Sequence, residues 1–250
     1  VSLNPFADSH KMLEQLEAKQ NKQIHDVLID EENELTKELE TLDQEATVAE
    51  QQGEENRDYM GEMLLAAQLM ITGGEKKEED AITRQDRYWI LKAVVKAANA
   101  AKTDNRDQMI ASDIIDAFHT MAEELEQAGK QSDQDIVKRL KKMASNMNLF
   151  CQDNLSSQYF NTPGKPWPEA DITILEMGLF KDEGYEAQRA LAFMGAMNKT
   201  VSLAEQHQYE ERFTLFFADE CHVVTNNPLT AVSVTKCSKM SRKIGLWLWF

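Results

Sequence analysis

The chain has 250 residues, 27 of them basic and 43 acidic, so its formal net charge at pH 7 is −16. This length allows a substantial core, and a hydrophobic content of 42% is too high for a disordered chain. The strong acidity argues against a general nucleic-acid binder, and no apolar run approaches the roughly 20 residues of a membrane span. Three cysteines without CxxC spacing favour a reducing cytoplasm over a disulfide framework. The chain opens on Val1 without a basic leader, so we expect no signal peptide and interpret the chain as cut from a longer one.

The charge and the prolines divide the chain at the same place. Residues 1–150 hold 31 acidic and 18 basic side chains, net −13, whereas residues 151–250 have a net charge of −3. No proline occurs between Pro5 and Pro163, which suits a set of helices because an interior proline breaks the helical hydrogen-bond ladder. We therefore expect an acidic helical region followed by a region of different architecture.

Six helices are predicted between about residues 8 and 150. The first covers about residues 8–29, where the apolar face lapses after Ala18. The other five are indicated by apolar residues at helical spacing, namely Leu35, Leu39, Leu42, Ala46 and Ala49; Met60, Met63, Leu64, Ala67 and Met70; Leu91, Val94, Val95, Ala98 and Ala101; Ile114, Phe118, Met121 and Leu125; and Ile136, Leu140, Met143 and Met147.

Glycines and polar runs mark the breaks between these helices. Gly73-Gly74 ends one helix, and we expect a loop from there through Asp80. Thr83 with Asp86 resembles a capping box, with Asp in place of the usual Glu. Polar turns are expected at 103–107 and 129–132.

After Cys151 the pattern changes to alternating strands and helices. A turn-rich connector at 162–168 is followed by predicted elements at 171–176 (strand), 186–206 (helix), 213–218 (strand), 229–240 (helix) and 244–250 (strand). This is an α/β layout. Residues 1–6 can supply a further strand, so we predict an α/β fold with a large all-α insertion: a first strand at 1–7, the helical insertion at 8–160 and an α/β segment at 161–250.

The most informative local pattern is the apolar run 213–218 ending in Asp219-Glu220-Cys221-His222. A buried strand that ends in two acids is typical of the Walker B motif of P-loop ATPases. There Asp219 would hold Mg²⁺ against the nucleotide phosphates and Glu220 would orient or deprotonate the attacking water. His222 could hydrogen-bond toward the γ-phosphate. The alternative is an ordinary strand followed by a solvated acidic loop.

One part of such a site is missing from the sequence. There is no GxxxxGK[ST], and Gly164-Lys165 lies in a proline-rich turn that does not lead into a helix. We therefore expect these 250 residues not to bind ATP well by themselves, and we expect the phosphate-binding loop upstream of Val1.

The chain resembles the TraC-like conjugative-transfer ATPases of bacterial type IV secretion. The resemblance rests on the order of four segments along essentially the whole chain: residues 1–6 (VSLNPF), 63–74 (MLLAAQLMITGG), 219–222 (DECH) and 241–249 (SRKIGLWLW). In that family an Asn-Pro-Phe strand follows the phosphate-loop helix, a helical insertion follows, and then come the Walker B strand and an Arg-Lys-x-Gly segment. Cys221 departs from the small residue that many relatives have, and the Walker A loop, N-terminal domain and Gln motif are missing.

The resemblance implies a P-loop (RecA-like) sheet segment in an ATPase that uses ATP and Mg²⁺ to power conjugative DNA transfer and pilus assembly. It implies other secretion components as partners, a homo-oligomer such as a hexamer, and a place at the cytoplasmic face of the inner membrane. It makes Arg242 a candidate phosphate-facing arginine, acting within one subunit or across a boundary; a plain positive charge at the start of a strand is the alternative.

Two other functions stay open. The acidic helices could be a protein-docking module without catalytic activity, for which residues 35–49 offer a short coiled-coil seam. The acidic motif also fits a DExH-type helicase, although that function would need a basic groove. We expect His10, His25, His119 and His207 to be surface or core residues and not metal ligands, and the cysteines to be packing residues.

Overall fold

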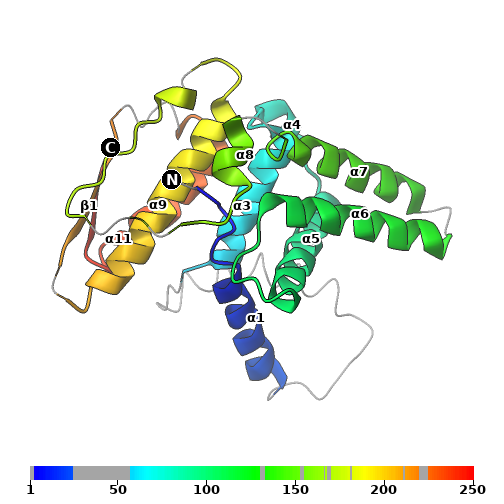
Figure 1. Ribbon diagram of the computed structural model, residues 1–250, viewed down its shortest axis with the longest axis horizontal. Coiled ribbons are helices and arrows are strands. Elements are labelled where there is room, and N and C mark those ends of the chain that lie inside the picture. The colour runs from blue at the N-terminus through cyan, green and yellow to red at the C-terminus, as the bar shows by residue number, and fades with distance from the viewer. Residues whose placement is uncertain are drawn as a thin grey trace.

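The computed structural model describes residues 3–24, 57–129, 133–152, 155–165, 167, 170–180, 182–210, 212–219 and 225–250. This part of the chain is predominantly helical, with one two-stranded parallel sheet (Figure 1). Its elements are α1 (Ser9–Ile24), α3 (Tyr59–Thr72), α4 (Lys76–Asp80), α5 (Arg84–Thr103), α6 (Ala111–Ala128), α7 (Gln134–Asn148), α8 (Leu155–Phe160), the 3-10 helix η2 (Gly178–Phe180), α9 (Glu186–His207), β1 (Thr214–Phe217), α11 (Pro228–Ser241) and β2 (Leu246–Trp249).

Helix α3 lies at the centre and contacts α1, α4, α5, α7, α9 and α11. Its sequence is apolar on nearly every side, as expected for a helix surrounded by others. The Asp58 side chain caps its start by accepting a 2.9 Å hydrogen bond from the Gly61 N–H, and Gly73 ends it at φ 66°. The predicted helix end at Gly73 is therefore confirmed.

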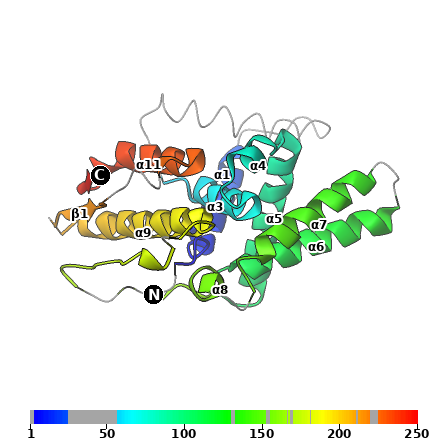
Figure 2. The same cartoon turned by 90° about the horizontal axis from the view of Figure 1, so that it is seen from above.

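On one side of α3, helices α5, α6 and α7 pack together, and α6 and α7 extend away from the rest as a hairpin (Figure 2). The predicted capping box at the start of α5 is confirmed, because Thr83 and Asp86 exchange side-chain-to-backbone hydrogen bonds.

The helices predicted from apolar spacing are confirmed for α3, α5, α6 and α7. The helix expected at 35–49 and residues 25–29 of the first helix lie outside the described residues.

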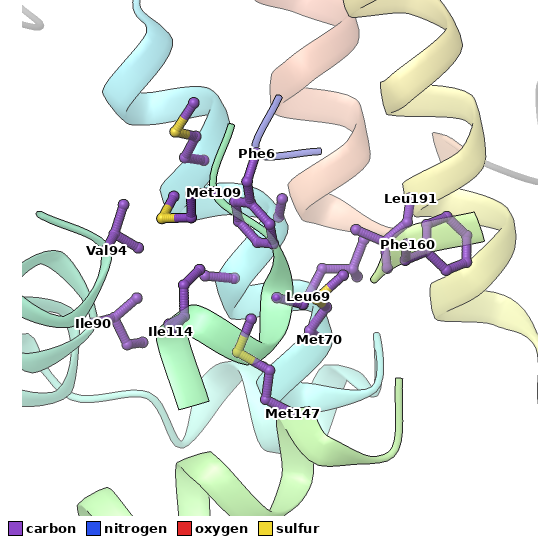
Figure 3. Close-up of a cluster of buried hydrophobic side chains, with 14 of the residues drawn as sticks. Phe6, Leu69, Met70, Ile90, Val94, Met109, Ile114, Met147, Phe160 and Leu191 are labelled. Carbon is purple, nitrogen blue, oxygen red and sulfur yellow. The ribbon is translucent and has the colours of Figure 1, made fainter. Parts of the chain in front are cut away.

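A single cluster of buried side chains extends from Phe6 to Leu246 and joins the helices to the sheet region. Figure 3 shows its centre, where Phe6 and Met109 meet Ile114 beside α3. Phe160 and Leu191 extend the same cluster toward α9.

The strand expected at residues 1–6 is wrong over its described part. Leu3 and Asn4 are irregular and residues 5–8 form a turn. The Leu3 N–H donates to the Tyr159 carbonyl at 2.8 Å, and the Asn4 side chain donates to the Met109 carbonyl at 2.9 Å. Asn4 also accepts from the Phe6 N–H at 3.0 Å, so a local Asx turn competes with an extended strand here.

Two further expectations differ from the structure, and one helix was not expected. The strand expected at residues 171–176 is wrong: these residues have no regular secondary structure, and Ile172 and Ile174 are 80% and 87% exposed. The alternation of apolar and polar residues was not sufficient to predict a strand, because a strand also needs a partner that lies elsewhere in the chain. The charged stretch expected as a loop forms α4, and α8 was not anticipated.

The sheet region is a β–α–β unit. Strands β1 and β2 pair in parallel and are connected through α11. Helix α9 packs on β1, α11 packs on β2, and the two helices pack on each other, so both cover the same face of the sheet (Figure 2).

Candidate functional site

Asp219 lies directly after the carboxyl end of β1. The two strands pair with Thr214 opposite Leu246 and Phe217 opposite Trp249. The Ala218 N–H donates to the Trp249 carbonyl at 2.9 Å, and Asp219 follows as an exposed residue. Ligands of open parallel sheets bind outside this edge, so the position of Asp219 suits a role in binding one.

The rest of the predicted acidic motif is not placed by the structure. Glu220, Cys221 and His222 lie outside the described residues. Asp219 is thus the one member of the motif whose position is known.

Arg242 lies at the opposite end of the sheet. It caps the C-terminus of α11, just before Gly245 and the start of β2. Because the strands are parallel and each has four residues at about 3.3 Å per residue, roughly 13 Å of strand separates this end from the edge that carries Asp219. Arg242 instead lines a hollow of about 550 Å³ between α11 and β2. Within one chain, the fold does not bring these two predicted site residues together.

Helix α9 sets the position of β1. Phe216 on the inner face of the sheet meets Phe193 of α9 edge-on, with ring centroids 5.7 Å apart. At the start of the strand, His207 Nδ1 lies 3.4 Å from Thr214 Oγ1. These contacts align the strand that leads to Asp219.

A magnesium ion would find one described ligand at this edge. Among the described residues, no group of three or more His, Cys, Asp or Glu side chains is arranged to hold a metal. Mg²⁺ in phosphoryl-transfer sites commonly takes only one or two carboxylates and completes its shell with phosphate oxygens and water. The position of Asp219 therefore fits an ion shared with a nucleotide.

A buried ion cluster around Arg57 was not anticipated. Arg57 precedes α3, is only 5% exposed, and forms a two-bond pair with Glu62 at 2.8 and 2.9 Å. It also donates to Ser202 Oγ of α9 at 2.6 Å and lies 3.6 Å from Asp8, before α1. Glu62 is only five residues from Arg57, but Ser202 and Asp8 are distant in the sequence, so local spacing does not predict the cluster.

Burial governs the titration of this cluster. Desolvation alone would lower the pKa of Arg57, but hydrogen bonds and charge from Glu62 raise it overall. Desolvation raises the pKa of Glu62, and Arg57 offsets only part of that effect. Burial also raises the pKa of the nearby Cys237 thiol to about 12, as expected for a packing cysteine.

Cys151 and the histidines were predicted to be packing or surface residues without a role in metal binding. Burial raises the pKa of Cys151 to about 12, so this thiol stays protonated at neutral pH. His10 and His119 are exposed and His207 is half-buried, whereas His25 and Cys221 lie outside the described residues.

No family model, no curated protein and no solved structure matches this chain. In the part of the chain that the structure describes, no helix has the length and apolar character to cross a membrane.

Proposed function

We propose that this chain is part of an ATPase that powers conjugative DNA transfer, type IV secretion and pilus assembly. The observation that carries the proposal is the β1–α11–β2 unit, in which a parallel strand ends directly before Asp219. This arrangement supports a P-loop type of sheet with the acidic pair at its ligand-binding edge. The role in conjugative DNA transfer and pilus assembly comes from the family resemblance.

In this proposal the acidic motif acts on a nucleotide. Asp219 holds Mg²⁺ against the phosphates, Glu220 orients the attacking water, and His222 hydrogen-bonds near the γ-phosphate. The phosphate-binding loop comes from outside these 250 residues, since they contain no GxxxxGK[ST].

Arg242 acts across a subunit boundary, because its own strand end lies away from Asp219. The proposal therefore requires a homo-oligomer such as a hexamer. Other secretion components at the cytoplasmic face of the inner membrane are the further partners that the resemblance implies.

The test uses a polypeptide that includes the phosphate-binding loop. Glu220→Gln should lower ATP turnover by about 10²–10⁴-fold while nucleotide affinity stays nearly unchanged, because the carboxylate acts on water and not on binding. Glu123→Gln, at an exposed position of α6, is the matched control and should leave turnover intact. Turnover that survives Glu220→Gln would contradict the proposal.

The 250-residue chain itself should bind ATP weakly or undetectably in calorimetry. Without the phosphate-binding loop, the carboxylates of Asp219 and Glu220 would repel the nucleotide phosphates unless Mg²⁺ lies between them. Micromolar affinity would show that the loop is not required.

A second candidate is the acidic docking module without catalysis. The net charge of −13 in residues 1–150 favours it. The two functions separate cleanly: the docking module would keep its activity after Glu220→Gln, and no ATPase activity would appear in the longer polypeptide.

A further inference from the structure

One face of the sheet carries large apolar side chains that no described element covers. Its four residues are Leu215, Phe217, Trp247 and Trp249, which are 62%, 62%, 67% and 66% exposed; we call them the outer sheet face. The strand register places Leu215 beside Trp247 and Phe217 beside Trp249, and the rings of the second pair meet edge-on at 6.0 Å. The four side chains therefore form one continuous patch.

A patch of this kind is unusual for a parallel sheet. Parallel strands occur almost always with helices on both faces, because both faces are apolar. Here α9 and α11 cover the inner face, through contacts such as Phe216 with Phe193. Large exposed patches of aromatic side chains commonly mark protein-binding surfaces, and tryptophan is among the commonest anchors in them.

The charges around the patch indicate what covers it. At the start of the strands, Arg212 and Lys243 line a hollow of about 390 Å³ together with Gln208, Phe213 and Gly245. Arg212 also lies 3.4 Å from Asp171, whose side chain is 97% exposed, so an acidic partner would compete with that solvent-exposed pair. At the other end of the strands lies Asp219. A helix that runs antiparallel to the strands would place its negative C-terminus over the two cations and its positive N-terminus near Asp219.

We propose that the outer sheet face docks an amphipathic α-helix of a protein partner, oriented antiparallel to β1 and β2. Acidic residues in the last turn of that helix reach the hollow at Arg212 and Lys243. The apolar stripe of the helix covers the aromatic pair and its neighbours. This inference does not rest on the proposed ATPase function, because the patch lies on the face of the sheet and not at the strand ends.

The probe is a labelled synthetic helix of about 18 residues with a leucine stripe and glutamates in its last turn. A comparison peptide of the same composition carries the glutamates in its first turn, where they favour helix formation, so weaker binding cannot come from lower helicity. Fluorescence anisotropy with the 250-residue protein should show the first peptide binding at least about fivefold more tightly at low salt.

Two variants test the contributions of the apolar patch and of the charges separately, and each has a control. Phe217→Thr combined with Trp249→Thr keeps β-forming residues and should weaken binding by at least about tenfold. Leu149→Thr, at an equally exposed leucine on the end of α7, is the control and should change nothing. Lys243→Gln should abolish the preference between the peptides, whereas Lys138→Gln on α7 should preserve it. Circular dichroism checks that each variant is folded.

Several results would overturn the proposal. Failure of both peptides to bind would do so, as would unchanged binding by the double variant. Sedimentation that shows self-association through the same four residues would assign the surface to a second copy. Binding to neutral phosphatidylcholine vesicles that the double variant loses would assign the surface to a membrane.

Discussion

The Arg57 side chain connects three parts of the molecule. Its guanidinium contacts Asp8 before α1, Glu62 of α3 and Ser202 of α9. It also lies over the Tyr59 ring, 4.7 Å from the centroid. A buried ion pair adds little compared with an apolar pair, but removal of one partner leaves a buried charge without compensation.

Arg57→Met should therefore lower the free energy of unfolding by about 3–5 kcal/mol at pH 8. Without the guanidinium, the raised pKa of Glu62 should rise further. A carboxyl with a raised folded-state pKa destabilises the fold above that pKa, so the loss should shrink as the pH falls and Glu62 becomes neutral. Urea unfolding at pH 8 and at pH 5 measures the difference.

The matched comparison adds Glu62→Gln to Arg57→Met. The double variant should regain part of the stability and lose most of the pH dependence, because the carboxylate closest to the removed guanidinium is gone, while Asp8 and Glu205 are more exposed. An equal loss at both pH values in the single variant would contradict the assigned role of Glu62.

Asp86 and Arg139 make a second pair, between α5 and α7. Burial would raise the pKa of Asp86, but hydrogen bonds from Arg139 and Thr83 outweigh it and keep the pKa below its ordinary value. Such a pair stabilises fully above the unfolded-state pKa of about 3.9, and the contribution is lost as the pH falls through the folded-state pKa.

Arg139→Met should cost about 1–2 kcal/mol at pH 7, and the gap from the parent protein should close in strong acid. Lys141→Met is the control: this lysine is 48% exposed like Arg139, but its partner Glu126 is itself 48% exposed. The control should cost less than about 1 kcal/mol. Denaturant titrations at pH 7 and pH 3 compare the two, and equal losses would argue against a special role for Asp86.

At the scale of elements, Asn227 joins the sheet region to the helical region. Its side-chain oxygen Oδ1 caps α11 by accepting hydrogen bonds from the backbone N–H groups of Leu229 and Thr230, at 2.9 and 3.1 Å. Its amide donates to the Gly74 carbonyl at 3.2 Å and to Glu79 Oε1 at 2.8 Å. One side chain thus begins α11 and attaches it to the segment after α3.

Asn227→Asp separates these two roles. Aspartate is as good a cap, but it cannot donate and its carboxylate would face Glu79, so we expect a loss of about 1–2 kcal/mol. Adding Glu79→Gln should restore most of it, because the glutamine amide can donate to the new carboxylate. Thermal unfolding of the single and double variants provides the measurement, and a neutral Asn227→Asp would show that only the cap matters.

The elements also show what the sequence could predict. Local spacing identified α3 and both strands, because apolar periodicity follows directly from which side is buried. The prediction of a strand at 171–176 was wrong because strand pairing depends on a neighbour that the local sequence does not specify. At the site, Asp219 was correctly expected after a strand. Arg242 was made a phosphate-facing candidate by the family resemblance alone, and the parallel pairing of β2 with β1 places it at the opposite end of the sheet.

For the whole molecule, the continuous core predicts a single unfolding transition. One buried cluster joins the helices around α3 to α9, α11 and β2. Domains that share a core unfold together. Circular dichroism of the backbone and fluorescence of the tryptophans should therefore give the same midpoint, and two separate midpoints would show that the helical and sheet regions unfold independently.

The chemistry of that core has a consequence for the protein under oxidative stress. Met70, Met109 and Met147 are almost fully buried near its centre (Figure 3). Conversion of a thioether to a sulfoxide inserts a polar oxygen into an apolar site, so the fold should lose stability with each modified side chain. Burial also shields the sulfur, so peroxide reaches it only when the core opens. The rate at which these methionines are oxidised therefore reports how often the centre of the molecule opens in its native state.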